Sequence, residues 1–160
     1  VVNAEGANTL YDLFNGNFKN TKLEWNNGKP DFDLLQRYYQ YKKDNNIFPK
    51  TRATAIQIGK PSNISKGLRA LWYTNGIVMQ VSDSEMMDGM SVVGLNGFDC
   101  ELASGAVPAG IRKLREQEII KEDDIVLGIL TGRQKDPSIS MEYHMNTKNR
   151  FSNPPKNIYQ

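Results

Sequence analysis

Cysteine and histidine are almost absent from this 160-residue sequence, which contains one of each, Cys100 and His144. A single cysteine excludes an internal disulfide and any metal site built from several cysteines, and it favours a reducing, cytoplasmic setting. A single histidine excludes a two-histidine metal centre. His144 remains as one general base at most, and we interpret it as a surface or packing residue. We expect no metal site.

Long apolar runs and an excess of one charge are also lacking. No run approaches the roughly 18 residues that cross a bilayer, and no basic segment followed by an apolar one opens the chain. The sequence has 20 basic and 18 acidic residues, a net charge of +2. This balance gives no electrostatic reason to expect nucleic acid or a membrane as a partner, so we expect a soluble protein.

The beginning of the chain is unusual, because residues 1–4 look like the end of a strand and no initiating methionine precedes them. We therefore expect the chain to begin inside a longer sequence, as a fragment or a processed product. Its length suffices for one hydrophobic core.

Short apolar segments typical of strands alternate with amphipathic segments typical of helices. This order predicts an α/β fold in which helical crossovers join parallel strands. Residues 20–50 suggest an insertion, exposed in its polar stretch 20–30, and residues 138–160 an extended tail after a domain of residues 1–137. The predicted strands are residues 1–4, 77–81 and 125–130, and the predicted helices are residues 9–14, 32–39, 64–72, 83–95 and about 104–115.

Several residues predict where these helices begin and end. Asn8 is placed to cap the helix at residue 9, Asp31 or Asp33 the next one, and Ser62 or Asn63 the third. Ser82 and Glu85 have the spacing of a capping box. Gly76 is expected to close the third helix in the left-handed conformation.

The most informative segment is the apolar run 125–130, which ends abruptly at Thr131-Gly132. We interpret it as a buried strand that places Thr131 at the carboxyl edge of a sheet, where open α/β sheets bind ligands. The alternative is that Thr-Gly serves only the turn. Residues 51–61 mix small and apolar side chains, which allow close approach of either a flat ligand or a neighbouring helix.

Motifs spread along the chain carry a resemblance to one family. They are AEGANTLY (4–11), ATAIQIGKPS (53–62), NGIV (75–78), VSDSE (81–85), ELASG (101–105), LTGRQKDP (130–137) and, in the tail, Tyr143-His144 and RFSNPP (150–155). In this order they resemble the C-terminal part of threonine synthase, a fold type II pyridoxal-phosphate enzyme related in fold to the tryptophan synthase β chain. The tail motifs resemble the plant-type branch.

The resemblance implies a lyase that converts O-phosphohomoserine and water to threonine and phosphate, with pyridoxal 5'-phosphate as coenzyme. In the family a Schiff-base lysine and a glycine-rich phosphate loop lie in the N-terminal half, and no motif here matches either. We therefore expect no catalytic residue in this chain and no activity from it alone. The N-terminal half would come from the same or a separate chain, in a homo-oligomer that is cytoplasmic, or plastidic if from a plant.

Four residues are implied to contact the coenzyme. Thr131 matches the family's hydroxyl residue that hydrogen-bonds the pyridine nitrogen, and Gly132 would leave room for the ring. Ala55 and Ile56 match a segment that passes near the coenzyme, where they would act through backbone and apolar contact.

Glu101 and Ser104 match a motif at the floor of the site. For Ser104 we prefer helix capping, and Glu101 has pairing with Arg112 or a neighbour as its alternative. The chain departs from the family pattern at Gln134, where a glycine is common, and at Leu102, where a proline is common.

Two other interpretations stay open. One is a different fold type II enzyme, such as a serine or threonine dehydratase. The other is a non-catalytic α/β module that binds a partner chain through an apolar face at residues 77–81 and 125–130.

Overall fold

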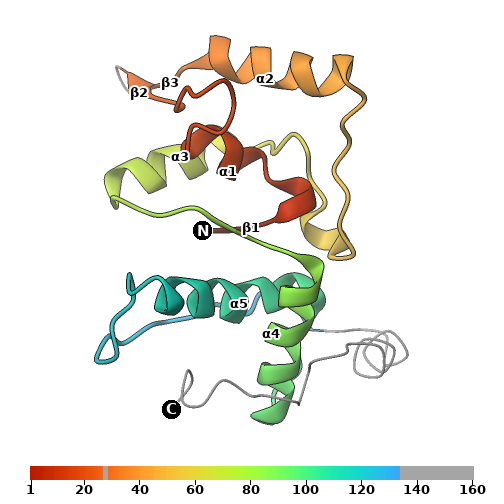
Figure 1. Cartoon of the computed structure of the whole chain (residues 1–160), viewed down its shortest axis with the longest axis vertical. Coiled ribbons are helices and arrows are strands. Elements are labelled where there is room, and N and C mark those ends of the chain that lie inside the picture. The colour runs from red at the N-terminus through yellow and green to blue at the C-terminus, as the bar shows by residue number, and fades with distance from the viewer. Residues whose placement is uncertain (27–28, 134–160) are drawn as a thin grey trace. The chain divides into compact units, whose positions relative to one another are not determined.

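The computed structural model describes residues 1–26 and 29–133, which form two compact units (Figure 1). Unit 1 consists of Val1–Thr51 and Ala55–Gln80, and unit 2 consists of Arg52–Thr54 and the chain from Val81 onward. The predicted tail, His144 and Gln134 lie outside the described residues.

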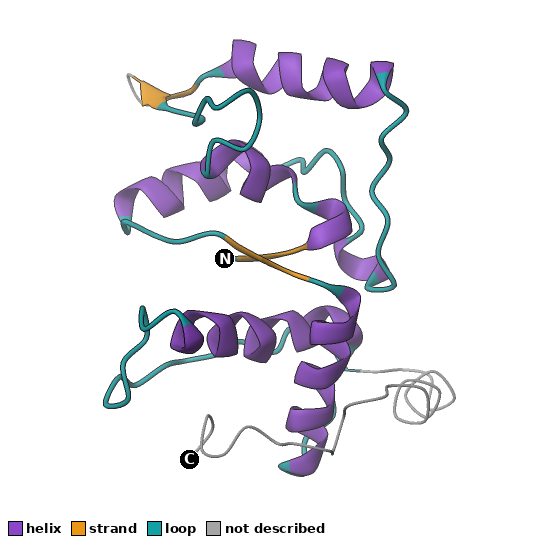
Figure 2. Cartoon of the chain, in the orientation of Figure 1, coloured by secondary structure: helices purple, strands orange, loops and turns teal. Residues whose placement is uncertain are grey.

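Unit 1 is mainly helical, with short strands between the helices (Figure 2). Its elements, in chain order, are β1 (Val2–Ala4), a 3-10 turn (Glu5–Ala7), α1 (Thr9–Phe14), β2 (Trp25–Asn26), β3 (Lys29–Pro30), α2 (Phe32–Asp44), α3 (Ile64–Tyr73) and β4 (Met79–Val81), the last reaching into unit 2.

Two small sheets accompany these helices. The amino group of Val1 donates to the carbonyl of Ile77 (2.8 Å), and the N–H of Met79 donates to the carbonyl of Val1 (2.9 Å). Val1 is thus bonded through its amino group and its carbonyl to two residues of the neighbouring strand that lie two positions apart. This pattern is typical of parallel strands, so β1 and β4 form a parallel pair. Strands β2 and β3 form an antiparallel hairpin. The predicted α/β class with parallel pairing is confirmed, on a small scale.

The core of unit 1 includes side chains from the predicted insertion. Phe18 and Tyr38 meet edge to face with ring centroids 5.1 Å apart, and Leu23 and Pro30 are buried. The expectation that residues 20–30 are exposed is therefore wrong at these two positions, because apolar side chains within a polar stretch still gain free energy by burial. The buried cluster is Leu13, Phe18, Leu23, Leu34, Leu35, Tyr38, Ile64 and Leu68.

Helix starts follow the sequence closely where a side chain acts locally. The carboxylate of Asp31 accepts from the N–H of Leu34 (3.0 Å), which confirms this cap. Ser82 and Glu85 form the predicted capping box. Asn8 and Asn63 occupy N-cap positions but make no capping hydrogen bond with their side chains.

The amide of Asn8 instead donates to Asp12 (3.1 Å) and Gln80 (2.9 Å). At the end of α3 the left-handed residue is Asn75, with φ 48°, and not Gly76 as predicted. Asparagine tolerates this conformation better than most residues, so it serves as well here.

Unit 2 is built on α4 (Asp83–Leu95) and α5 (Leu102–Glu116), which lie against each other (Figure 1). Helix α5 begins at Leu102, two residues before the predicted start. A Cβ atom at Gly89 would overlap the carbonyl oxygen of Gly105, and one at Gly105 would overlap that of Met86. The two backbones thus approach as closely as glycine allows. Within the described residues no helix is long and apolar enough to span a membrane.

The prediction of a buried strand at residues 125–130 is wrong. The segment belongs to no sheet and is drawn as loop in Figure 2. Ile125, Leu127 and Ile129 are 103%, 87% and 66% exposed, whereas Val126 and Leu130 are 42% and 41% exposed. The more exposed residues alternate with the less exposed ones, which is strand periodicity, but no described strand lies beside the segment to bury it.

Candidate functional site

The four predicted coenzyme residues lie in two places. Thr131 and Gly132 belong to unit 2, whereas Ala55 and Ile56 belong to unit 1. Thr131 and Ala55 are exposed, and Gly132 and Ile56 are half-buried. Their convergence on one coenzyme stays a prediction.

Ser104 holds Thr131 and Gly132 in place. Its side chain is 1% exposed, and its Oγ accepts hydrogen bonds from the N–H groups of Thr131 and Gly132, both at 3.1 Å. The same hydroxyl donates to the carbonyl of Gly132 (3.4 Å). The interpretation of Ser104 as a helix cap is therefore wrong, because its oxygen is occupied by a segment 27 residues further along the chain.

Glu101 closes this arrangement from the other side. Its N–H donates to the carbonyl of Gly132 (3.0 Å), and any Cβ at position 132 would overlap the carboxylate of Glu101. A larger residue at position 132 would therefore require the Glu101 side chain to move. The alternative pairing of Glu101 with Arg112 is not observed, since Arg112 pairs with Glu116 (3.4 Å).

The backbone between residues 128 and 132 runs back along α5. A Cβ at Gly128 would lie 3.0 Å from the Val107 side chain, and the Ser104 contacts follow near the start of the same helix. The Thr131 backbone is fixed in this way, while its hydroxyl makes no hydrogen bond to any residue in the ranges 1–26 and 29–133.

Cys100 lies beside this arrangement and is 1% exposed. Burial raises the pKa of its thiol to about 11, and the nearby carboxylates of Asp99 and Glu101 contribute to the shift. At neutral pH the thiol is protonated, so Cys100 is unsuited to act as a nucleophile.

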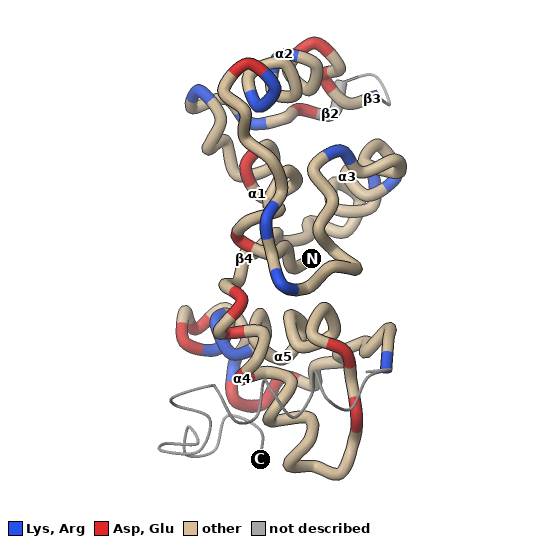
Figure 3. The backbone as a smooth tube through the Cα atoms, turned by 90° about the vertical axis from the view of Figure 1, so that its right-hand side faces the viewer, with Lys and Arg blue, Asp and Glu red and all other residues tan. Residues whose placement is uncertain are grey.

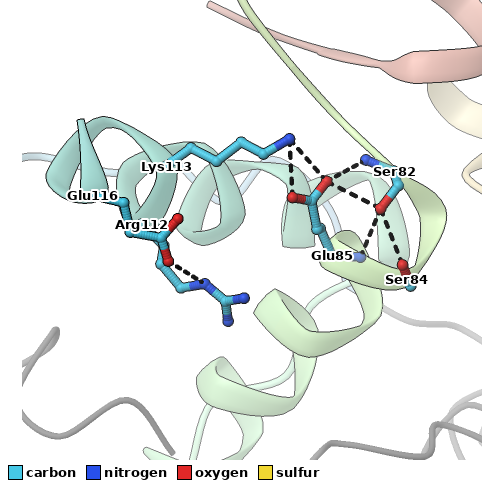
Figure 4. A network of polar contacts seen from close by, with 6 residues as sticks. All are labelled: Ser82, Ser84, Glu85, Arg112, Lys113 and Glu116. Carbon is cyan, nitrogen blue, oxygen red and sulfur yellow. Dashed lines mark hydrogen bonds and ion pairs between the residues drawn. The ribbon is translucent and has the colours of Figure 1, made fainter.

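A polar network fixes the start of α4 against α5 (Figure 4). The Ser82 N–H donates to Glu85 Oε2 (2.7 Å), and Lys113 Nζ lies 2.9 Å from Glu85 Oε1. Burial raises the pKa of Glu85, but these hydrogen bonds and the positive charge of Lys113 outweigh it and hold the pKa below its ordinary value. The network supports the helix that carries Ser104.

Ala55 and Ile56 follow a similarly constrained path in unit 1. Ile58 donates its N–H to the carbonyl of Ile56 (2.8 Å), and Thr9 Oγ1 donates to the carbonyl of Gly59 (2.7 Å). The segment lies close to the loop that contains Pro49: a Cβ at Gly59 would be 3.2 Å from the ring of Pro49.

Comparison with known proteins gives a consistent result. No protein-family model matches the chain. Threonine synthase of Methanosarcina acetivorans is 41% identical over 91 residues, which cover 56% of this chain and 22% of that protein. Threonine synthase of Methanocaldococcus jannaschii is 37% identical over 95 residues, covering 58% of this chain and 24% of that protein.

Threonine synthase 2, chloroplastic, of Arabidopsis thaliana matches almost the entire chain. It is 29% identical over 160 residues, covering 97% of this chain and 27% of that protein. The chain therefore spans about a quarter of the length of these curated relatives. It is similar to threonine synthases of archaea and plants, and it corresponds to their C-terminal part.

Proposed function

We propose that this chain is the C-terminal part of a pyridoxal-phosphate-dependent threonine synthase, which converts O-phosphohomoserine and water to threonine and phosphate. The observation that carries the proposal is the match of 97% of the chain to a protein named threonine synthase. The Schiff-base lysine and the phosphate loop would come from the remainder of the enzyme, in a homo-oligomer. The chloroplastic relative favours a plastid over the cytoplasm.

The residues around Thr131 fit the pyridine side of the coenzyme. Bound pyridoxal phosphate supplies an electron sink for the reaction. The hydroxyl of the exposed Thr131 is of the right type to hydrogen-bond a ring nitrogen, and it does not force that nitrogen to be protonated as a carboxylate would. Gly132 adds no side chain beside the Glu101 carboxylate, and in this proposal it leaves room for the ring.

The rest of the chain positions this hydroxyl. Ser104 binds both backbone N–H groups, and Glu101 binds the Gly132 carbonyl, so the orientation of Thr131 is set before any ligand arrives. In this proposal Thr131 contacts the coenzyme and Ser104 is a positioning residue. Ala55 and Ile56 would contribute apolar contact from unit 1.

The test uses Thr131→Val in the complete enzyme. This change keeps the side-chain shape and removes the hydroxyl, a loss of about 1–3 kcal/mol where the group is buried by its ligand. We expect weaker coenzyme binding, measured by absorbance, and slower phosphate release from O-phosphohomoserine, with Thr131→Ser restoring most of both. Thr74→Val is the matched control, because Thr74 is the exposed C-cap residue that follows α3 and lies outside the proposed site.

The same preparations separate the alternatives. Release of phosphate from O-phosphohomoserine supports the proposal, whereas formation of 2-oxobutanoate from threonine without that release indicates a dehydratase. If Thr131→Val keeps both its activity and its coenzyme binding, Thr131 serves only the turn. Absence of any coenzyme binding would favour the non-catalytic module.

A further inference from the structure

Unit 1 contains a cavity that the proposed function does not use. Its volume of about 770 Å³ is within the range of about 300–1,000 Å³ typical of small-molecule sites. It lies between α2, the segment that follows α2, and the loops around Asn8 and Lys60. None of the four predicted coenzyme residues lines it.

One wall of the cavity is apolar and open. Ile47 and Phe48 line it and are 40% and 75% exposed, with Pro49 next to them. A large aromatic side chain exposed at the mouth of a hollow offers a surface on which a flat ring can stack.

The lining of the cavity also carries positive charge. Lys42, Lys43 and Lys60 line the cavity, whereas no Asp or Glu among the described residues does. Lys42 is paired with Asp12 at 3.5 Å, but Lys43 and Lys60 have no carboxylate partner within the ranges the structure describes. Lys42 and Lys43 occupy the last turn of α2, the uppermost helix in Figure 3.

One of the lining residues carries a buried hydroxyl. Tyr39 lines the cavity, and its hydroxyl oxygen is inaccessible to solvent yet has no hydrogen-bond partner in the described part of the chain. Such a group is costly to leave unsatisfied. Burial raises the pKa of Tyr39, so the hydroxyl keeps its proton. The ammonium of Lys60 lies 5.2 Å from the centre of the same ring.

The walls are held by hydrogen bonds that do not involve these groups. Lys50 donates its N–H to the carbonyl of Gly6 (2.7 Å), which ties the apolar wall to the loop before α1. Tyr38 donates its hydroxyl to Asp12 (2.9 Å), which ties α2 to α1. The cavity is thus formed in advance of any ligand.

We propose that this cavity binds a small organic anion that carries a flat ring, with its phosphate or carboxylate group at Lys43 and Lys60 and its ring against Ile47 and Phe48. No proposed coenzyme contact lines the cavity, so the site would serve an effector or a second ligand. It stands whether or not the chain is part of a threonine synthase.

The experiment titrates the 160-residue chain with phenyl phosphate at low ionic strength, by calorimetry and by backbone amide chemical shifts. We expect binding with shifts confined to α2, residues 46–49 and residues 59–60. Phenylacetate tests a carboxylate in place of the phosphate, and binding of either anion supports the site. Inorganic phosphate and benzyl alcohol, which each carry half of the features, are expected to bind at least about tenfold more weakly.

Two variants test the assignment of roles. The double variant Lys43→Met, Lys60→Met is expected to bind at least about tenfold more weakly. The charge-matched control Lys66→Met, Lys121→Met changes two exposed lysines outside the cavity and is expected to bind normally. The proposal is overturned if neither ring-bearing anion binds, or if the Lys43, Lys60 variant binds as tightly as the control.

Discussion

The contact between α4 and α5 predicts a large penalty for adding a single methyl group at Gly105. The Cβ atom of Gly105→Ala would overlap the carbonyl oxygen of Met86 and lie 3.0 Å from the backbone nitrogen of Met90. Every one of these atoms belongs to the α4 backbone, so no side chain can rotate out of the way. The two helices must separate.

The magnitude follows from two opposing effects. Overpacking of this kind typically destabilises a protein by about 1–3 kcal/mol. The better helix propensity of alanine returns about 0.5–1 kcal/mol. We therefore expect Gly105→Ala to lower the free energy of unfolding by up to about 2 kcal/mol. At about 2–4 °C per kcal/mol for a chain of 160 residues, this is a fall in Tm of up to about 4–8 °C.

The assay is unfolding by urea, followed by circular dichroism, with hydrogen exchange to locate the effect. Protection should fall in α4 and α5 and not in unit 1. Gly67→Ala is the control, because Gly67 lies within α3 and a Cβ there has nothing within 4 Å. That variant should gain about 0.5–1 kcal/mol. Equal stability of the two variants would refute the close approach of the backbones.

Two further predictions concern titratable groups of unit 2. Because hydrogen bonds and Lys113 hold the pKa of Glu85 below its ordinary value, Glu85 stabilises the fold above the pKa of the unfolded chain, and this stabilisation is lost as pH falls through the folded pKa. Glu85→Gln should therefore be less stable than the parent by about 0.5–1 kcal/mol at pH 7, and its stability should approach that of the parent below about pH 4. The control Glu116→Gln alters an exposed ion pair and should change the stability little. Cys100, with its pKa raised to about 11 by burial, should react with a disulfide reagent far more slowly at pH 8 in the folded chain than in urea; equal rates would show that the thiol is accessible.

Local side-chain chemistry made part of this fold predictable. The capping box of Ser82 and Glu85 lies within four consecutive residues and marks the start of α4. The predicted bounds of α1 and α4 match the observed ones. The exposure of residues 125–130 was not predictable in this way. Apolar content indicates a strand, but burial depends on neighbouring strands that the pattern within one segment does not specify.

The candidate site shows the same limit. Sequence placed Thr131 and Gly132 next to each other, and the resemblance gave them a role, but the anchor of both, Ser104, was interpreted as a cap. A hydroxyl near the start of a helix is typical of a cap. Only the fold shows that its oxygen is bound by a segment far along the chain.

The open outer face of residues 125–129 has a consequence for the behaviour of this chain in solution. Ile125, Leu127 and Ile129 present their side chains on one face of an extended backbone, and such a backbone is a template on which another extended chain can add by main-chain hydrogen bonds. Concentrated samples are therefore expected to self-associate through this segment. A charged residue at position 127 would act as a gatekeeper that keeps the chain dispersed while the contacts of Gly128 with α5 remain.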